Sequence, residues 1–274
     1  MKRVLVAIGI ASMLGAACGG APGSGSNASA SPGIGGAARA DLAPTGRLRL
    51  AFPASPPFLG QQDPQSGKWK GLAITMGNAL AAQLGVSLVP IQSPGPAQTY
   101  QALQSGSVDV ALAQLQLKPD GVSSTGAVVS VEHTFLVRAD SALKSVADVD
   151  RQGIKIGGVG SEGHTAILGS RLQHAQLVRF NSDAQGLAAL AAGQIDAYAS
   201  GRFALVDMSS QIPGSRILDG SFFTPMLAFA TLSSRSTGAA FLNTFAVSEL
   251  STGQVQRDID AIVARPGVVA GPPA

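Results

Sequence analysis

The sequence predicts an α/β protein of two similar lobes, each a mostly parallel sheet flanked by helices. Two observations predict this fold class. The segment ALQSGSVDV at 102–110 is echoed by ALAAGQIDA at 189–197, and each copy ends an apolar helix at Gly, a frequent helix terminator, before a strand begins. Each copy also lies in its own run of alternating strands and helices. One αβ unit therefore occurs twice in the chain.

The first half of the chain alternates strand and helix. Polar and apolar residues alternate in a first strand at 47–52. Apolar residues at steps of four between 72 and 84 predict an amphipathic helix that Gly85 ends. The remaining elements of this half are a second strand at 86–91, a helix at 98–104, a third strand at 108–113 and a strand at 134–138 that leads out of the lobe.

The second half repeats this order. Its predicted strands lie at 155–159, 177–180 and 195–199, its helices at 163–174 and 183–192, followed by an apolar strand at 226–232 and closing helices at 238–250 and 253–264. Continuous apolar strands of this kind are typical of sheets that are covered on both faces.

The N-terminus has the pattern of an export signal. Positive charge at Met1–Arg3 precedes an apolar run, Val4–Leu14, that is too short to span a bilayer. We expect residues 1–17 to be a removed signal peptide. Cys18 is the only cysteine, which excludes disulfides within the chain and multi-cysteine metal sites. The preceding Leu-Gly-Ala-Ala resembles a bacterial lipobox, so Cys18 is the expected lipidation site; the alternative is an ordinary secretory signal with an incidental cysteine.

Composition and charge limit which kinds of segment and partner the rest of the chain can have. Residues 18–45 are nearly all Gly, Ala, Ser, Pro, Asn and Thr, which predicts a flexible tether before a folded part at 46–266 and a tail at 267–274. Loss of Lys2 and Arg3 with the signal lowers the formal net charge from +3 to +1. No basic run with interleaved aromatic residues indicates nucleic-acid binding. No second apolar stretch reaches membrane-spanning length.

With these elements placed, the chain resembles the periplasmic-type solute-binding proteins of family 3, which serve polar amino-acid ABC importers. The resemblance rests on RLRLAFPASPPF at 47–58, GKWKGLAITMGNALAAQLGV at 67–86, ALQSGSVDVALA at 102–113, SVADVDRQGIKIGGVGS at 145–161, LAALAAGQIDAYAS at 187–200 and FLNTFAVSELSTGQVQRDI at 241–259. It implies a type II periplasmic binding protein-like fold, with lobe 1 at 46–134 and 230–266, lobe 2 at 138–224, and two hinge strands near 134–138 and 225–231.

By the same resemblance, ligand-binding residues lie in three segments: the loop after the first strand, the end of the third strand, and the turn at 160–164. That turn opens a helix, whose free N–H groups and dipole can hold an anion, although it is also an ordinary structural turn. The expected site residues are Phe52, Phe58, Gln114, Gln116, Lys118, Ser161, Glu162, Gly163 and His164, with Phe135 as a further apolar wall.

Several of these residues have a second interpretation. Lys118 is equally consistent with a solvated loop lysine. His133 either faces the site or solvates the hinge, and His174 at a helix end favours the helix dipole. The three histidines show no metal-ligand spacing, so no metal site is expected. Asp109 and Asp196, at matching places in the two copies, are expected to hold turns.

The departures from the family pattern bear on the ligand. Gly121 stands where the resemblance implies an Arg that pairs with the α-carboxylate of an amino acid, and Gly201 stands where it implies an acid for the α-ammonium. Ser55 replaces an aromatic residue in the first loop. Burying a zwitterion without these charges is costly. An ordinary amino acid is therefore a poor candidate, and a small organic acid or a neutral polar molecule suits the remaining groups better.

The functional prediction is an extracytoplasmic solute-binding lipoprotein, anchored to the cell-envelope membrane by its lipid. It captures a small polar or anionic solute between two lobes and delivers it to an ABC permease, as a monomer and without a cofactor. No catalytic motif such as GxSxG is present, so no enzyme is expected. Two alternatives remain: a ligand sensor or adaptor on the same fold, and a periplasmic enzyme of the cyclohexadienyl dehydratase type. Ligand-dependent stabilisation favours transport or sensing, and turnover of prephenate-like acids favours the enzyme.

Overall fold

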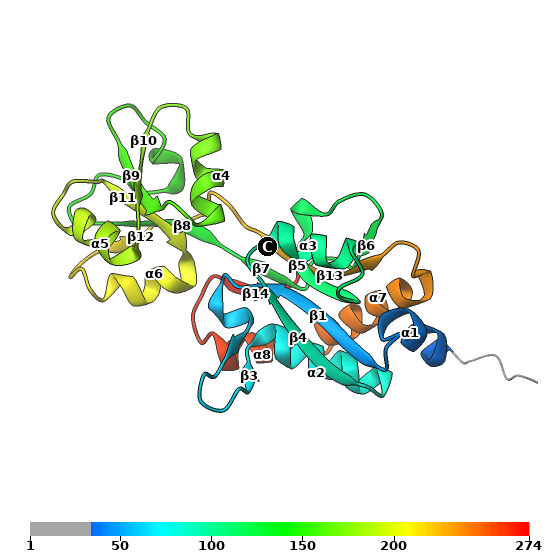
Figure 1. Cartoon of the computed structure of the whole chain (residues 1–274). Helices are drawn as coiled ribbons and strands as arrows, with labels where there is room; N and C mark the ends of the chain where they lie inside the picture. The colour runs from blue at the N-terminus through cyan, green and yellow to red at the C-terminus, as the bar shows by residue number, and fades with distance from the viewer. Residues whose placement is uncertain (1–33, 274) are drawn as a thin grey trace, which may run out of the picture. The chain divides into compact units, whose positions relative to one another are not determined.

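Two mixed sheets organise the protein (Figure 1). The computed structural model describes residues 34–273, so the predicted signal peptide, Cys18 and tether residues 18–33 lie outside the described residues. We call the first sheet with its helices lobe 1 and the second sheet with its helices lobe 2. The predicted α/β class with two lobes is confirmed.

Lobe 1 is built on a sheet with the strand order β14-β7-β13-β5-β1-β4, in which β6 also pairs with β13. Its strands are β1 (Arg47–Pro53), β4 (Ser87–Ser93), β5 (Val110–Gln114), β6 (Val122–Ser124), β7 (Val129–Val131), β13 (Met226–Leu232) and β14 (Val268–Ala270), and a small hairpin joins β2 (Gln61–Gln62) to β3 (Trp69–Lys70). Its helices are α1 (Ile34–Leu42), α2 (Leu72–Leu84), α3 (Pro96–Gln104), α7 (Ser236–Ser251) and α8 (Gln254–Ile262).

Lobe 2 is built on a sheet with the order β10-β9-β11-β8-β12. Its strands are β8 (His133–Val137), β9 (Lys155–Val159), β10 (Gln176–Phe180), β11 (Ala197–Gly201) and β12 (Arg216–Ile217), and its helices are α4 (Gly163–Arg171), α5 (Asp183–Ala191) and α6 (Arg202–Ser209). None of the helices described in the two lobes is long and apolar enough to cross a membrane.

The sheets are less parallel than predicted. Within lobe 1, β1 runs parallel to β4 and β5, and within lobe 2, β9 runs parallel to β10 and β11. The other pairings of both sheets are antiparallel. All of these except β14–β7 involve a strand that has just crossed between the lobes: β8 enters the second sheet from lobe 1 and β13 enters the first from lobe 2, each against the direction of its neighbours. The predicted hinge strands are thus strands of the lobes themselves.

The crossings lie just beside those strands. The chain leaves lobe 1 between β7 and β8 and returns between β12 and β13. The two crossing segments bond to each other, because the His133 N–H donates to the Phe223 carbonyl at 2.9 Å and the Phe222 N–H donates to the His133 carbonyl at 3.0 Å. The connection between the lobes is therefore a pair of hydrogen-bonded segments.

The glycines of the repeated unit end their helices as predicted. Gly106 after α3 has φ 73° and Gly193 after α5 has φ 71°, a left-handed conformation that residues with a Cβ adopt at a cost. The Gly106 N–H donates to the Leu103 carbonyl, and the Gly193 N–H donates to the Leu190 carbonyl, both at 3.1 Å. The two copies in the sequence therefore form the same turn in the two lobes.

The predicted tether is wrong for residues 34–45, because helix α1 begins at Ile34. Ala38 and Leu42 are fully buried, and the side chain of Asp41 accepts a hydrogen bond from the Gly238 N–H at 2.8 Å in the first turn of α7. A Cβ at Gly238 would lie 2.7 Å from Leu42, so the two helices are in close contact. The composition of residues 18–45 did not indicate this helix, because only two apolar residues, one turn apart, attach it to lobe 1.

The predicted tail is also wrong in part. Strand β14 pairs antiparallel with β7, in register from Val268 opposite Val131 to Ala270 opposite Val129. Lobe 1 therefore includes the C-terminal strand and extends beyond the predicted boundary at 266.

Candidate functional site

The loop after β1 contains residues of lobe 1 that touch lobe 2. The Ser55 hydroxyl, at the position where the resemblance implies an aromatic residue, donates to the Glu162 carboxylate at 3.2 Å. Phe58, in the short 3-10 helix Pro57–Leu59, meets Phe203 of α6 edge to face, with ring centroids 5.1 Å apart and planes at 89°. Both contacts lie beyond the carboxyl ends of parallel strands, where open α/β sheets bind ligands.

The predicted turn at 160–164 opens helix α4. Glu162 is the N-cap residue, and its carbonyl accepts from the N–H groups of Thr165 and Ala166. Within the described residues, the N–H groups of Ser161, Gly163 and His164 have no hydrogen-bond acceptor. The helix end therefore has the free donors that the sequence predicted, and it also has its own carboxylate from Glu162.

Two histidines meet at the crossing between the lobes. His133 begins β8, His164 is the second residue of α4, and their ring centroids lie 4.7 Å apart with the planes at 38°. Burial, and next the proximity of His164, lowers the pKa of His133 to about 3, and burial also lowers the pKa of His164. Both imidazoles are therefore mainly neutral at pH 7. His133 thus lies in contact with a predicted site residue, which favours the first of its two interpretations.

Gly201 is covered by an aromatic ring. It ends β11 opposite His133, and a Cβ built there would lie 2.5 Å from the ring of Phe203. Glycine at this position therefore leaves room for Phe203. The position at which the resemblance implied an acidic side chain is taken by the ring that contacts Phe58 of lobe 1.

Phe52 does not line the site, which corrects the prediction. Its side chain is fully buried in the core of lobe 1, where it packs edge to face on Trp69 at 5.7 Å. Strand alternation explains this placement, because Phe52 shares one face of β1 with the buried Leu48 and Leu50. Phe135 is likewise a core residue, stacked on Phe222 at 4.8 Å within lobe 2.

The polar residues after β5 differ in availability. The Gln116 amide is used by the returning chain: its Nε2 donates to the Thr224 carbonyl and its Oε1 accepts from the Met226 N–H, both at 3.1 Å. Lys118 Nζ donates to the Val122 carbonyl of its own loop at 3.0 Å, in agreement with its structural interpretation. Gln114 is only 7 % exposed, and its side-chain amide has no partner among the described residues. Gln114 is thus the best candidate of the three for a ligand contact.

Arg202 was missed by the sequence reasoning. Its Nε donates to Glu132 Oε2 at 2.6 Å, and a terminal nitrogen donates to the carbonyls of Leu218 at 3.2 Å and Gly220 at 2.8 Å. Glu132 belongs to the outgoing crossing, and Gly220 adjoins the returning one. Arg202 therefore fastens the start of α6 to both crossings. Phe203 was missed as well, and the only signal for either residue was a position within two residues of Gly201.

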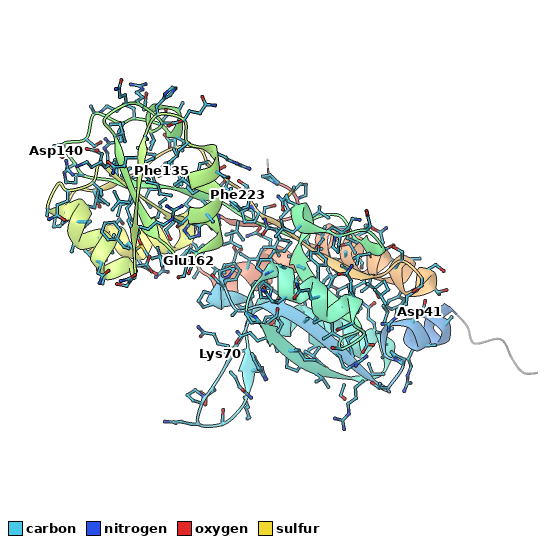
Figure 2. All side chains as sticks on the ribbon, turned by 45° about the horizontal axis from the view of Figure 1, so that its top comes forward. Asp41, Lys70, Phe135, Asp140, Glu162 and Phe223 are labelled. Carbon is cyan, nitrogen blue, oxygen red and sulfur yellow. The ribbon has the colours of Figure 1, made fainter. Side chains whose placement is uncertain are left out.

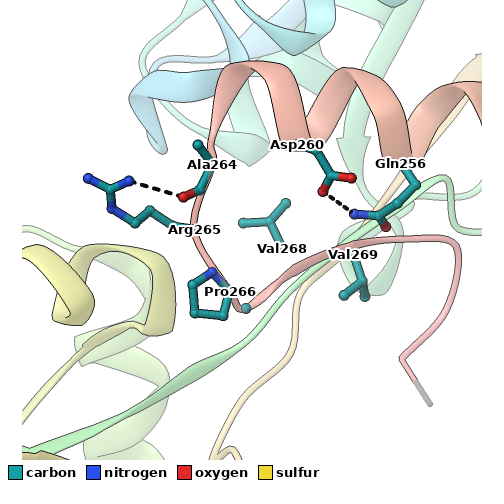
Figure 3. A pocket seen from close by; sticks show the side chains of 8 residues that line it. Gln256, Asp260, Ala264, Arg265, Pro266, Val268 and Val269 are labelled. Carbon is teal, nitrogen blue, oxygen red and sulfur yellow. Dashed lines mark hydrogen bonds between the residues drawn. The ribbon is translucent and has the colours of Figure 1, made fainter.

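Two cavities lie in lobe 1, and one of them borders the site at Phe58. One of about 390 Å³ lies between α8 and residues 264–269, where the Gln256 amide bonds to Asp260 and Arg265 bonds to the Ala264 carbonyl (Figure 3). The other, about 420 Å³, adjoins Phe58 and Lys70. No group of three or more His, Cys, Asp or Glu residues within 34–273 could hold a metal ion.

Comparisons with known proteins agree on the fold. No protein-family model matches the chain, and no curated protein matches it. Among solved structures, a mutant of ArgBP from T. maritima has 18% identity and TM-score 0.61, over 83% of this chain and all of that one. An ancestral amino-acid-binding protein, a precursor of cyclohexadienyl dehydratase, has 20% identity and TM-score 0.59, over 80% and 96%. The L-cysteine solute receptor of Neisseria gonorrhoeae has 17% identity and TM-score 0.60, over 82% and 92%. The chain therefore has the two-lobed α/β fold of the amino-acid-binding proteins.

Proposed function

We propose that this chain is an extracytoplasmic solute-binding lipoprotein that captures a small polar or anionic solute between its two lobes and delivers it to an ABC permease. The observation that carries the proposal is the meeting of the Ser55–Phe58 loop with the starts of α4 and α6, beyond the strand ends of both sheets. A solute bound there contacts both lobes. It therefore binds more tightly when the lobes are closed on it than when they are apart, and this difference in affinity favours the closed arrangement.

Ligand-dependent stabilisation tests this proposal. The chain without its signal is screened by thermal shift against organic acids, amines, sugars and amino acids, followed by small-angle scattering with any solute that binds. A ligand at a hundred times its Kd adds about 2.7 kcal/mol to the free energy of unfolding, so capture is readily visible. A stabilising solute that also lowers the radius of gyration supports capture. Stabilisation without any change in scattering contradicts capture between the lobes.

We expect the standard L-amino acids to leave the melting temperature unchanged at millimolar concentration. Gly121 and Gly201 provide neither of the two charges that would replace the hydration of a zwitterion. The same thermal-shift measurement checks this expectation. A clear shift with any ordinary L-amino acid would show that other groups replace the missing charges.

We propose lipid attachment at Cys18 and the monomeric state together with this function. Cys18→Ser should release the protein from the membrane fraction, because the thioether to the lipid can no longer form. Detergent partitioning of the native and variant chains measures the difference. Equal partitioning of the two chains into detergent contradicts the anchor.

The enzyme alternative has one specific feature in its favour. Glu162 and two neutral imidazoles lie near one another, and such groups can transfer protons in general acid–base catalysis. We nevertheless propose a non-enzymatic role, because the chain has no motif that assigns a nucleophile or base. If the purified chain turned over prephenate and Glu162→Gln abolished this activity, the proposal of solute capture would be replaced by that of an enzyme. A solute that is bound but never handed to a permease would instead favour the sensor or adaptor.

A further inference from the structure

Contacts at the junction of the lobes close into a circuit of side chains. Ser55 donates to Glu162, and two residues later the ring of His164 lies against that of His133. His133 lies opposite Gly201 in the sheet, the ring of Phe203 covers Gly201, and Phe203 meets Phe58. Phe58 lies three residues after Ser55, which closes the circuit. We call the following residues the junction circuit: Ser55, Glu162, His164, His133, Gly201, Phe203 and Phe58.

Only one member of the junction circuit carries charge at pH 7. Among the described residues, the Glu162 carboxylate has no ion pair, and its one hydrogen bond is accepted from the Ser55 hydroxyl. The two histidines are mainly neutral because of burial. The nearby Arg202, at the start of α6, is already neutralised by Glu132 of the outgoing crossing at 2.6 Å. The circuit therefore has a net negative charge.

This charge works against an anionic solute at the α4 N-terminus. The positive end of a helix dipole favours a negative group, and the N-cap residue Glu162 already brings a carboxylate to this end, although it makes no capping hydrogen bond. A second carboxylate would lie beside the first, where like charges repel. Lys118, the one cation among the predicted site residues, donates to the Val122 carbonyl of its own loop.

The aromatic members point to the opposite charge. Phe58 and Phe203 provide two rings, and the negative face of an aromatic ring attracts an organic cation. Neutral imidazoles have a nitrogen that accepts a hydrogen bond from an ammonium group. We infer that the junction circuit selects an organic cation without a carboxylate, such as an alkyl ammonium or a quaternary ammonium ion, with Glu162 as its counter-charge. This inference rests on the proposed function of solute capture and narrows its ligand.

A matched set of probes tests the inference. n-Butylammonium, butyrate and n-butanol differ in charge but share one chain, and choline serves as a quaternary cation. Thermal shift and calorimetric titration of the chain without its signal should show binding of the cations and none of butyrate. Glu162→Gln keeps the size of the side chain and removes the charge, so it should weaken cation binding about tenfold or more. Phe203→Leu should weaken it about threefold, through the loss of one ring.

A control variant distinguishes the effect of the Glu162 charge from the effect of the overall charge of lobe 2. Asp140→Asn removes the same charge from an exposed side chain of lobe 2, well away from Glu162 in Figure 2, and should leave cation affinity unchanged. Butyrate binding as tight as that of the cations overturns the inference and leaves solute capture intact. Cation affinity that is unchanged in Glu162→Gln also overturns it. If none of the four probes binds, the inference is overturned, and the broader solute screen with scattering decides capture independently.

Discussion

The two copies of the repeated αβ turn place an aspartate at the same position and use it differently. In both lobes the aspartate N–H donates to the carbonyl of the first strand, and the carboxylate accepts the N–H of the same residue: Arg49 for Asp109, and Lys155 for Asp196. The backbone turn is thus the same in both copies. Only the side chains around the two carboxylates differ.

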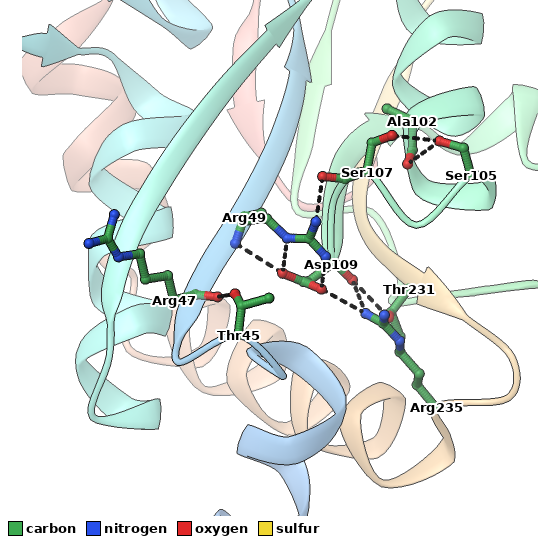
Figure 4. A network of polar contacts seen from close by, with 9 residues as sticks. All are labelled: Thr45, Arg47, Arg49, Ala102, Ser105, Ser107, Asp109, Thr231 and Arg235. Atoms are coloured by element: carbon green, nitrogen blue, oxygen red, sulfur yellow. Dashed lines mark hydrogen bonds and ion pairs between the residues drawn. The ribbon is translucent and has the colours of Figure 1, made fainter.

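In lobe 1 the carboxylate is an ion-pair centre. Asp109 is fully buried, accepts both forks of the Arg49 guanidinium at 2.8 Å, and also accepts from Arg235 at 3.2 Å (Figure 4). In lobe 2, Lys155 is exposed, and Asp196 accepts only a backbone N–H at 2.8 Å within the described residues. A planar guanidinium can hold a carboxylate with two parallel donors in one plane, a geometry that an ammonium does not have. A third segment, just before α7, completes the burial of Asp109.

The largest effect that this comparison predicts is that of Asp109→Asn. The substitution leaves two guanidinium groups facing a neutral amide in a buried place, and breaking a buried pair of this kind costs about 3–5 kcal/mol. Urea unfolding of the native and variant chains measures the loss. A loss below about 1 kcal/mol, the typical value of a surface ion pair, would show that the three residues do not act as a buried network.

Local signals made most of the fold predictable. Strands β9 and β13 and helix α2 have the predicted bounds, because each is a continuous apolar or periodic segment that ends at a glycine or a polar turn. Helix α1 and strand β14 could not be predicted in this way. Both are short, and each is held by a partner remote in sequence: α1 by α7 and β14 by β7. Strand direction also depended on the route of the chain between the lobes.

The site was less predictable than the fold. The sequence pointed to the loop that carries Ser55 and to the turn before α4, because both follow predicted strands. It could not show that Phe52 faces the core, or that Gln116 bonds to the returning crossing, since both facts depend on contacts between segments. The pairing of His133 with His164 likewise arises only when β8 and α4 lie together.

The second prediction concerns the loss of stability of lobe 2 in acid, which we expect His133 to cause. The pKa of His133 is about 3 in the folded chain, below the ordinary 6.5 of the unfolded chain, so the unfolded state binds more protons between these values. Stability is therefore complete above pH 6.5 and is lost as the pH falls toward 3. The loss from this residue at pH 5 should be about 2 kcal/mol.

Unfolding as a function of pH measures this loss, and ¹³C-resolved histidine spectra assign it. His133→Gln should flatten the dependence between pH 7 and pH 5, and His174→Gln, which removes an exposed histidine of the same lobe, controls for the loss of one imidazole. An equally steep dependence in His133→Gln would place the proton uptake elsewhere and would leave the pair of histidines without a part in acid stability.

The smallest effect should come from the counterpart of Asp109 in lobe 2. Asp196→Asn keeps an oxygen that can accept the Lys155 N–H and removes a charge that no guanidinium neutralises, so only the charge-assisted part of one hydrogen bond is lost. We expect a decrease of about 1 kcal/mol or less in the free energy of unfolding, measured in the same urea series as Asp109→Asn. Similar losses for the two variants would mean that the backbone turn, common to both lobes, accounts for the role of the aspartate. A clear gap between them would assign the difference to Arg49 and Arg235.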